Sequence, residues 1–547
     1  MLKKILLFGL AGLCMTGVKA QEQRFRPPMD HAITFAGNFG EIRANHYHGG
    51  LDFKTGGAEG KVVRSVADGY ISRVQVNSGS GYVITVVHEG YTSVYRHLSR
   101  FVEPIASRAE QMQYDNQSWE LEWHPEKDEY PVKAGQQIGW SGNTGYSMGP
   151  HLHLDIFDNE TDEYVDPLPF FITRVNDHTP PRADGLMLFP QAGQGVVDGQ
   201  QTSQVYPLKP QKPVKAWGLI GVGIKAYDYM EAVTNKYGVK HVVLTVDGDS
   251  VFESDLSRFA YEENRYINSW CEGQYMKSFI EPGNKLRMLS DLNGQAGLIR
   301  IDEERPYRLQ YTLTDAFGNT TKVNFTITGE RQEIKPLGYE EKDILAWDRV
   351  NVVQQPGLEL VIPRGMLYKD AYLDTQVSNS EQFVSAVYQL TQDNVKLHGP
   401  CELQIGVAQM PVADEGKYQI VRVGKRGNSR VGGRLENGFV KARVQELGTF
   451  AVEVDTIPPE IKPVNEQLWV KNGKVELAPS DKQSDIAAYS ATIDGEWALM
   501  GRPNSVSNHL VLKLDPKRVK RGQKHRLAVS VTDGCGNTTE REFSFNW

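Results

Sequence analysis

The feature that most constrains the fold is a β-hairpin pattern that occurs twice in the chain. Residues 308–321 (RLQYTLTDAFGNTT) and 526–539 (RLAVSVTDGCGNTT) share an alternating apolar run, an aspartate and a Gly-Asn turn. Apolar side chains at every second position, joined by a tight turn, predict an antiparallel hairpin with one buried face. We interpret the two copies as the closing hairpins of two immunoglobulin-like β-sandwiches, by analogy of fold alone.

The remaining sequence predicts more β domains. The chain has 547 residues, which is too long for one hydrophobic core. A Pro-Pro pair follows an aspartate at residues 177–181 and again at 455–459, as expected of stiff linkers between domains. We therefore predict an all-β protein made of these parts: a signal peptide at 1–20, an antiparallel-sheet domain at 25–175, an immunoglobulin-like β-sandwich at 176–330, a β-sandwich-like module at 338–454 and an immunoglobulin-like β-sandwich at 455–547.

Charge and the amino-terminal residues indicate export. The formal net charge is −8, which argues against nucleic acid as a partner. Residues 1–20 have Lys3 and Lys4, then a short apolar run, and a small residue at position 20, which is the pattern of a secretory signal peptide. Lipidation at Cys14 is a less favoured alternative, because Leu13 precedes it. We expect no transmembrane segment in the mature chain, and a location in the periplasm, the cell envelope or outside the cell. Three separate cysteines are expected to be small buried hydrophobes, with no disulfide framework: Cys271, Cys401 and Cys535.

Two short histidine motifs suggest a metal site. His151 and His153 are two apart before an apolar run, so on a strand they share one face at ~6–7 Å. His48 and Asp52 are four apart and share a face if extended, with Gly49-Gly50 leaving space beside them. Two imidazoles, one carboxylate and an open fourth position form the pattern of a catalytic zinc. His97 ends a β-rich run, and taken alone it is more typical of a structural histidine.

These motifs together carry a resemblance to a known family. His48-x-x-x-Asp52, the run Tyr95–Ser99 (YRHLS), and GWSGNTG at 139–145 followed by GPHLH at 149–153 resemble the M23 zinc metallopeptidases. These lysostaphin/LytM-type endopeptidases cut peptide cross-links of bacterial peptidoglycan. The match covers about residues 35–158. It implies that one Zn²⁺ is held by His48, Asp52 and His153. It also implies that His97 and His151 are the catalytic pair that acts on the water and the transition state.

The resemblance implies an exported zinc metalloendopeptidase whose partners are the stem peptides and cross-bridges of peptidoglycan. The modules after residue 175 would space the enzyme, dock it, bind the wall or an envelope protein, or cover the cleft. If they cover it, a chain ending near Thr173 should digest walls faster. One alternative is a non-catalytic LytM-like activator of another wall hydrolase, although such relatives usually lack some metal ligands. A surface adhesin is a third alternative.

Two parts of the first domain depart from the family pattern. Some family members have a tyrosine upstream of the first histidine, but only Phe39 and Tyr47 lie there and neither is a clear match. Residues 108–130 form an insertion in which Trp119, Leu121 and Trp123 alternate. We expect it to form a short hairpin that lines the cleft or merely decorates the surface.

Overall fold

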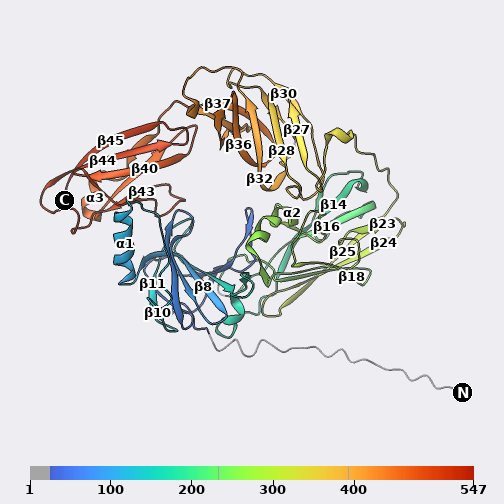
Figure 1. Cartoon of the computed structure of the whole chain (residues 1–547). Coiled ribbons are helices and arrows are strands. Elements are labelled where there is room, and N and C mark those ends of the chain that lie inside the picture. The colour runs from blue at the N-terminus through green and yellow to red at the C-terminus, as the bar shows by residue number, and fades with distance from the viewer. Residues whose placement is uncertain (1–24, 232, 392–393) are drawn as a thin grey trace.

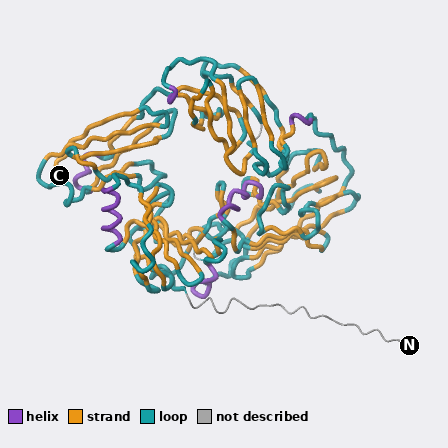
Figure 2. The backbone as a smooth tube through the Cα atoms, in the orientation of Figure 1, coloured by secondary structure: helices purple, strands orange, loops and turns teal. Residues whose placement is uncertain are grey.

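A computed structural model describes residues 25–231, 233–391 and 394–547. The predicted signal peptide and Cys14 lie outside this part of the chain. Strands account for 48% of the residues and helices for 8%, which confirms the all-β class. Figure 2 shows strands and loops throughout, with only a few short helices. Within the described ranges, no helix is both long and apolar enough to cross a membrane.

Four β-rich parts follow one another along an arc that brings the last beside the first (Figure 1). We name them the first (25–175), second (176–330), third (338–454) and fourth (455–547) modules, using the boundaries predicted from the sequence. The first module carries the histidine motifs. Its central antiparallel sheet has the order β1-β4-β12-β8-β7-β6-β10, and a small hairpin, β2-β3, precedes β4.

The strands of the first module's sheet include β8, the β-rich run that contains His97. The sheet also includes β19, from the second module, which pairs with β13. The strands are β1 (Phe35–Gly37), β4 (Gly50–Lys54), β5 (Val62–Arg64), β6 (Gly69–Asn77), β7 (Gly81–Val87), β8 (Tyr91–Phe101), β9 (Leu121–Trp123), β10 (Pro131–Val132), β11 (Gln137–Ser141), β12 (His151–Asp158), β13 (Tyr164–Val165) and β19 (Arg258–Phe259), with the hairpin β2 (Ile42–Arg43) and β3 (His46–Tyr47) beside them.

The second module is one connected sheet of eleven strands, because β16 pairs with β14 on one side and, in parallel, with β25 on the other. This connectivity leaves the immunoglobulin-like β-sandwich expected for residues 176–330 a prediction. Its elements are β14 (Arg182–Val197), β15 (Gln204–Tyr206), β16 (Val214–Tyr227), β17 (His241–Val246), β18 (Asp249–Asp255), β20 (Cys271–Glu272), β21 (Tyr275–Lys277), β22 (Leu289–Asp291), β23 (Ile299–Ile301), β24 (Pro306–Thr314), β25 (Thr320–Gly329) and the helical turns η4 (Tyr261–Tyr266) and α2 (Ile267–Trp270).

The third module has two five-stranded antiparallel sheets around one apolar core. A further short pair, β26-β29, lies beside them. The strands are β26 (Ile344–Leu345), β27 (Asn351–Gln355), β28 (Leu358–Ile362), β29 (Ala371–Tyr372), β30 (Gln376–Ser378), β31 (Val387–Gln389), β32 (Lys396–Gly406), β33 (Tyr418–Arg422), β34 (Ser429–Gly432), β35 (Arg434–Glu436), β36 (Phe439–Glu446) and β37 (Thr449–Val454).

The fourth module has two four-stranded sheets around its own core. Its elements are β38 (Glu460–Pro463), α3 (Trp469–Asn472), β39 (Lys474–Ser480), β40 (Ile486–Ile493), β41 (Glu496–Trp497), β42 (Met500–Gly501), β43 (Leu510–Lys513), β44 (Lys524–Asp533) and β45 (Thr538–Asn546). Both repeated hairpins are confirmed, as β24-β25 and β44-β45. The immunoglobulin-like assignment of the second and fourth modules stays a prediction.

The insertion of the first module is not the hairpin predicted for residues 108–130. It begins with a helix, α1 (Ile105–Asp115), which buries Ile105, Ala109 and Gln113 at a helical spacing of four. Leu121 and Trp123 lie on the single short strand β9, which pairs with β6, whereas Trp119 lies just before it. His124, just after it, is exposed.

The insertion instead contacts the fourth module. The ring of Tyr114 lies edge-on to Trp497, with centroids 5.2 Å apart. Trp119 packs over Gly501, where an added Cβ would lie 2.0 Å from the indole ring. Figure 1 shows α1 directly beside the fourth module. The insertion is therefore one of the places where the last module contacts the first.

The first and second modules share their cores at the opposite side. Phe39 and Tyr47, from the segment before β4, are buried in the apolar core of the second module. Met230 and Tyr237, from the second module, are buried in the core of the first. The segment that leads into the His48 motif is thus held by residues nearly 200 positions away.

Candidate metal centre

Three neighbouring strands bring the sequence-predicted residues together. Strand β12 lies between β4 and β8, and His153 pairs directly with Asp52 in the register of β12 and β4. Opposite residues of an antiparallel pair have Cβ atoms about 4.5–5.5 Å apart, so these two side chains can share one ion. Gly50 is required here, because an added Cβ would lie 2.2 Å from the carbonyl oxygen of Leu154.

His48, Asp52 and His153 form one compact group of ligand atoms. The Nε2 atom of His48 lies 3.0 Å from Oδ1 of Asp52 and 2.9 Å from Nδ1 of His153. Nδ1 of His153 lies 2.8 Å from the same carboxylate oxygen. All three residues are buried, and one donor atom of each lies within 4.8 Å of the others.

The outer nitrogen of each histidine is held by an acceptor, which fixes the tautomer. Nδ1 of His48 donates to the carbonyl oxygen of Asn38 at 2.6 Å. Nε2 of His153 donates to Asp155 at 2.5 Å, and Asp155 is itself paired with Arg96 at 2.6 Å. Such outer partners orient a ligating imidazole and raise its basicity. The inner nitrogen of each ring is therefore directed at the shared centre.

The charge states suit a cation. Burial raises the pKa of Asp52, but His48, His151 and His153 together hold it well below its usual value, so this carboxyl is an anion. Burial lowers the pKa of His48, which favours the neutral imidazole. Burial also disfavours charge on His153, yet Asp155 and Asp52 raise its pKa to about 9. In the ion-free site His153 thus carries the proton that a metal would displace.

His97 and His151 lie beside this group and do not belong to it. Their rings have centroids 4.8 Å apart, and Nε2 of His151 is 3.4 Å from Oδ1 of Asp52. Nδ1 of His97 donates to the carbonyl of Thr144 at 2.7 Å, and Nδ1 of His151 to that of Gly149 at 2.8 Å. In the neutral form of each ring Nε2 is therefore the nitrogen with the lone pair. Burial, followed by the neighbouring histidines, lowers the pKa of His97 to about 3, so this ring is neutral.

The backbone at His97 is strained. His97 has a φ of 62°, in the left-handed region that costs a non-glycine residue about 1–2 kcal/mol. The pairing of β8 with β7 and with β11 shifts register at this point, as in a β-bulge. Bulges next to active sites redirect a side chain, and here the bulged residue is one that the sequence motifs predict to be catalytic.

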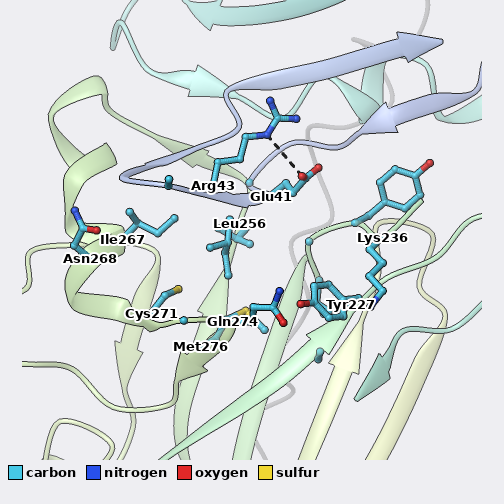
Figure 3. A pocket seen from close by; sticks show the side chains of 18 of the residues that line it. Glu41, Arg43, Tyr227, Lys236, Leu256, Ile267, Asn268, Cys271, Gln274 and Met276 are labelled. Carbon is cyan, nitrogen blue, oxygen red and sulfur yellow. Dashed lines mark ion pairs between the residues drawn. The ribbon is translucent and has the colours of Figure 1, made fainter. Parts of the chain in front are cut away.

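Arg43 joins the metal group to a neighbouring cavity. Its Nη2 atom lies 2.7 Å from Oδ2 of Asp52, the oxygen that faces away from the histidines, and its Nε atom is 3.6 Å from Glu41. Figure 3 shows Arg43 and Glu41 on the hairpin that forms one wall of this cavity, with Asn268, Cys271 and Gln274 on the other side. The cavity has a volume of about 340 Å³.

Some residues of the site were not predicted from the sequence. Asp155 was available as a signal, because it is two residues after His153 on the same strand face. No sequence pattern indicated Asn38 or Arg43. Asn38 contributes a backbone carbonyl, which any residue has, and Arg43 reaches Asp52 only because of the β2-β3 hairpin. Phe39 and Tyr47, considered upstream of His48, are buried in the second module's core, away from the role of oxyanion donor. Tyr47 is 2% exposed.

The sheet presents two histidines and one aspartate to a common centre, with two further histidines beside it, so the site has a donor set that could hold one metal ion. Comparison with known proteins agrees. The chain is 36% identical over 133 residues to the glycyl-glycine endopeptidase ALE-1 of Staphylococcus capitis, covering 23% of this chain and 29% of that protein. It is 58% identical over 43 residues to lysostaphin of Staphylococcus simulans, covering 7% and 8%.

A metalloprotease of Haemophilus influenzae is 31% identical over 137 residues, covering 25% of this chain and 22% of that protein. Among solved structures, the catalytic domain of Staphylococcus simulans lysostaphin aligns with 27% identity and a TM-score of 0.19, covering 25% of this chain and 89% of that domain. The chain spans less than a third of the length of each of these curated relatives. The predicted resemblance to the M23 metallopeptidases is confirmed for about a quarter of the chain. Separately, the Zu5-like domain family matches residues 342–455, nearly the whole third module.

Proposed function

We propose that this chain is an exported, zinc-dependent endopeptidase that hydrolyses peptide cross-links of bacterial peptidoglycan. The observation that carries the proposal is the group of His48, Asp52 and His153, whose donor atoms converge within 4.8 Å. Two imidazoles and a carboxylate are the donor set of catalytic zinc sites such as His₂Glu, so the residues fit one Zn²⁺. The relatives named above, which include a glycyl-glycine endopeptidase and lysostaphin, support the substrate class.

When bound, zinc would polarise the scissile carbonyl and lower the pKa of a water molecule to about 7. The chain's own residues do the rest. Oδ1 of Asp52 faces both ligating histidines, while Arg43 holds the other carboxylate oxygen. His97 and His151 are held through Nδ1, which leaves the Nε2 atoms to accept a proton from water and to return one to the leaving amine.

Metal analysis and a cross-linked muropeptide assay test this proposal together. The wild type should hold one zinc per chain and cut peptide bonds. His153→Ala should do neither, because it removes a ligand. His97→Ala and His151→Ala should keep zinc but lose about 10²- to 10⁴-fold in turnover, the usual contribution of general acid–base groups.

His124→Ala is the matched control, because His124 is exposed outside the site and should change neither zinc content nor turnover. Wild-type protein that holds zinc but cuts no wall type would refute the hydrolase and favour a wall-binding activator. Wild-type protein that holds no zinc would refute the metal site. Mass spectrometry of the fragments released from sacculi with different cross-links would identify which peptide bond is cut.

A further inference from the structure

A second group of buried acids lies where the first and second modules meet. Asp177 comes from the Pro-Pro linker, Asp228 follows β16, and Asp315 precedes the turn of the repeated hairpin. One carboxylate oxygen of each lies within 4.8 Å of the others. All three residues are buried, at 5%, 3% and 4% exposure. They are remote in sequence from the His48 motif and have no part in the proposed hydrolysis.

Two of these carboxylates each have one buried oxygen without a hydrogen-bond partner. Oδ1 of Asp228 and Oδ2 of Asp177 are buried and make no hydrogen bond. Within the described ranges, no lysine or arginine forms an ion pair with Asp177, Asp228 or Asp315. A buried carboxylate oxygen without a hydrogen-bond partner is destabilising, and three neighbouring carboxylates also repel one another. The cluster therefore lacks a positive charge at its centre.

Asp315 is fixed as the third member by its own turn. Its Oδ1 atom accepts from the backbone N–H groups of Phe317 and Asn319, both at 2.8 Å, and its Oδ2 atom from the Asn319 side chain at 2.8 Å. Asn319 also donates to the carbonyl of Asp177 at 3.1 Å, which ties the linker to the hairpin. These hydrogen bonds therefore fix the position of the Asp315 carboxylate without a bound ion.

The fourth module repeats the whole arrangement. Asp455, Asp481 and Asp533 occupy the same places: the Pro-Pro linker, the residue after the strand that pairs with the post-linker strand, and the hairpin turn. Asn537 donates to the carbonyl of Asp455 at 3.1 Å, as Asn319 does to Asp177. Oδ2 of Asp455, a fully buried residue, again has no hydrogen-bond partner. The two modules thus place three aspartates at corresponding positions, although Asp481 is half-buried where Asp228 is buried.

We propose that each of these two aspartate clusters binds one calcium ion. The three ligand atoms that each cluster offers are carboxylate oxygens, which suit Ca²⁺ better than a zinc site built on nitrogen or sulfur. Ca²⁺ binds oxygen at 2.3–2.6 Å, so ligands on opposite sides lie about 5 Å apart, in agreement with the observed spread. Three carboxylates supply the negative charge, and backbone carbonyls and water can complete the six to eight ligands that Ca²⁺ takes.

The first cluster would also steady the metal centre. The backbones of Asp228 and Tyr237 exchange two hydrogen bonds, which close the loop between them. From that loop Tyr237 donates to the carbonyl of Phe35, and Gly238 exchanges two hydrogen bonds with the Asn38 side chain. The carbonyl of Asn38 is the acceptor that orients His48. Calcium at Asp228 would therefore hold the base of the loop whose end contacts Asn38, the residue whose carbonyl orients His48.

Calcium stoichiometry tests the proposal directly. The mature full-length chain is dialysed against CaCl₂, freed of unbound ions by gel filtration, and assayed for calcium and zinc by mass spectrometry. The wild type should retain two calcium ions per chain, and CaCl₂ should raise its melting temperature. Asp228→Asn and Asp455→Asn should each retain one, and the double variant none, while zinc content stays the same in all.

Asp249→Asn is the matched control, since Asp249 is an exposed aspartate of the second module and should leave both ions bound. Wild-type protein that retains no calcium overturns the proposal whether or not the variants fold, and it would mean that the clusters only share protons. Loss of one ion in Asp228→Asn with no change in Asp455→Asn would support the first site and overturn the second. Because zinc is measured in the same sample, failure of the calcium sites is distinguishable from failure of the zinc site.

Discussion

Asn504 holds the contact that brings the fourth module onto the first, and its substitution gives a sharp test of that contact. Its Nδ2 atom donates to the carbonyls of Asn143, at 2.7 Å, and Ser147, at 2.9 Å. Two backbone hydrogen bonds flank it, from Gly145 to Pro503 at 2.7 Å and from Ser505 to Gly145 at 3.0 Å. These bonds lie on the loop immediately before the His151 motif.

The effect of Asn504→Ala can be worked out from these bonds. It removes two of the four cross-module hydrogen bonds, each contributing about 0.5–1.5 kcal/mol, so docking should weaken by about 2 kcal/mol, or about 30-fold. Asn504→Asp should weaken it further, because a carboxylate would face two carbonyl oxygens. The aspartate keeps the oxygen that accepts from Val506 and Ser507, so the local turn survives.

Amide hydrogen exchange measures how often the fourth module undocks from the first. The amides of Gly145 and Ser505 should exchange about 30-fold faster in Asn504→Ala, if undocking is the opening that exposes them. Val506→Ala is the control, because this exposed side chain should leave both rates unchanged. Unchanged exchange at both amides in Asn504→Asp would refute the inference that Asn504 holds the modules together.

The same variants should lower peptidase activity if the proposed function holds. Thr144, on the docked loop, is the acceptor that fixes the His97 tautomer. An undocked loop would leave His97 less well oriented, and turnover should fall in the order wild type, Asn504→Ala, Asn504→Asp. A rise in turnover would instead mean that the fourth module restrains the enzyme.

Three further outcomes are expected. A chain ending at Thr173 should have a lower melting temperature or aggregate, rather than digest walls faster, because Phe39 and Tyr47 lose the second module that buries them; a soluble fragment with unchanged melting would contradict this. Asp155→Asn should cost about 10- to 100-fold in zinc affinity or activity, as measured by metal titration, because it loosens the orientation of His153, and wild-type affinity would exclude that role. Burial, then Asp315, raises the pKa of Asp228 from 3.8 to about 8 in the folded, calcium-free chain. Its contribution to stability is therefore full below about pH 4 and is lost as the pH rises to 8, so the urea midpoint should fall between about pH 4 and 8 and level off above that, and Asp228→Asn should lack that fall.

The local pattern of the sequence was enough to predict the strands and the chemistry of the first module. The alternation in the repeated hairpins is a short-range property, and the structure has these strands where the period of two placed them. The spacing of His151 and His153 likewise limits their arrangement once both are on one strand. The roles of these residues in catalysis stay predictions.

Only the tertiary structure shows the contacts between distant parts of the chain. No short-range pattern shows that Asn38 would be held by Gly238, or that Phe39 would be buried in another module's core. The insertion was predicted as a hairpin because Trp119 to Trp123 alternate, yet the helix α1 precedes them and both pack on the fourth module. Side-chain period reports the local backbone, whereas packing between modules depends on surfaces that the chain assembles only after it folds.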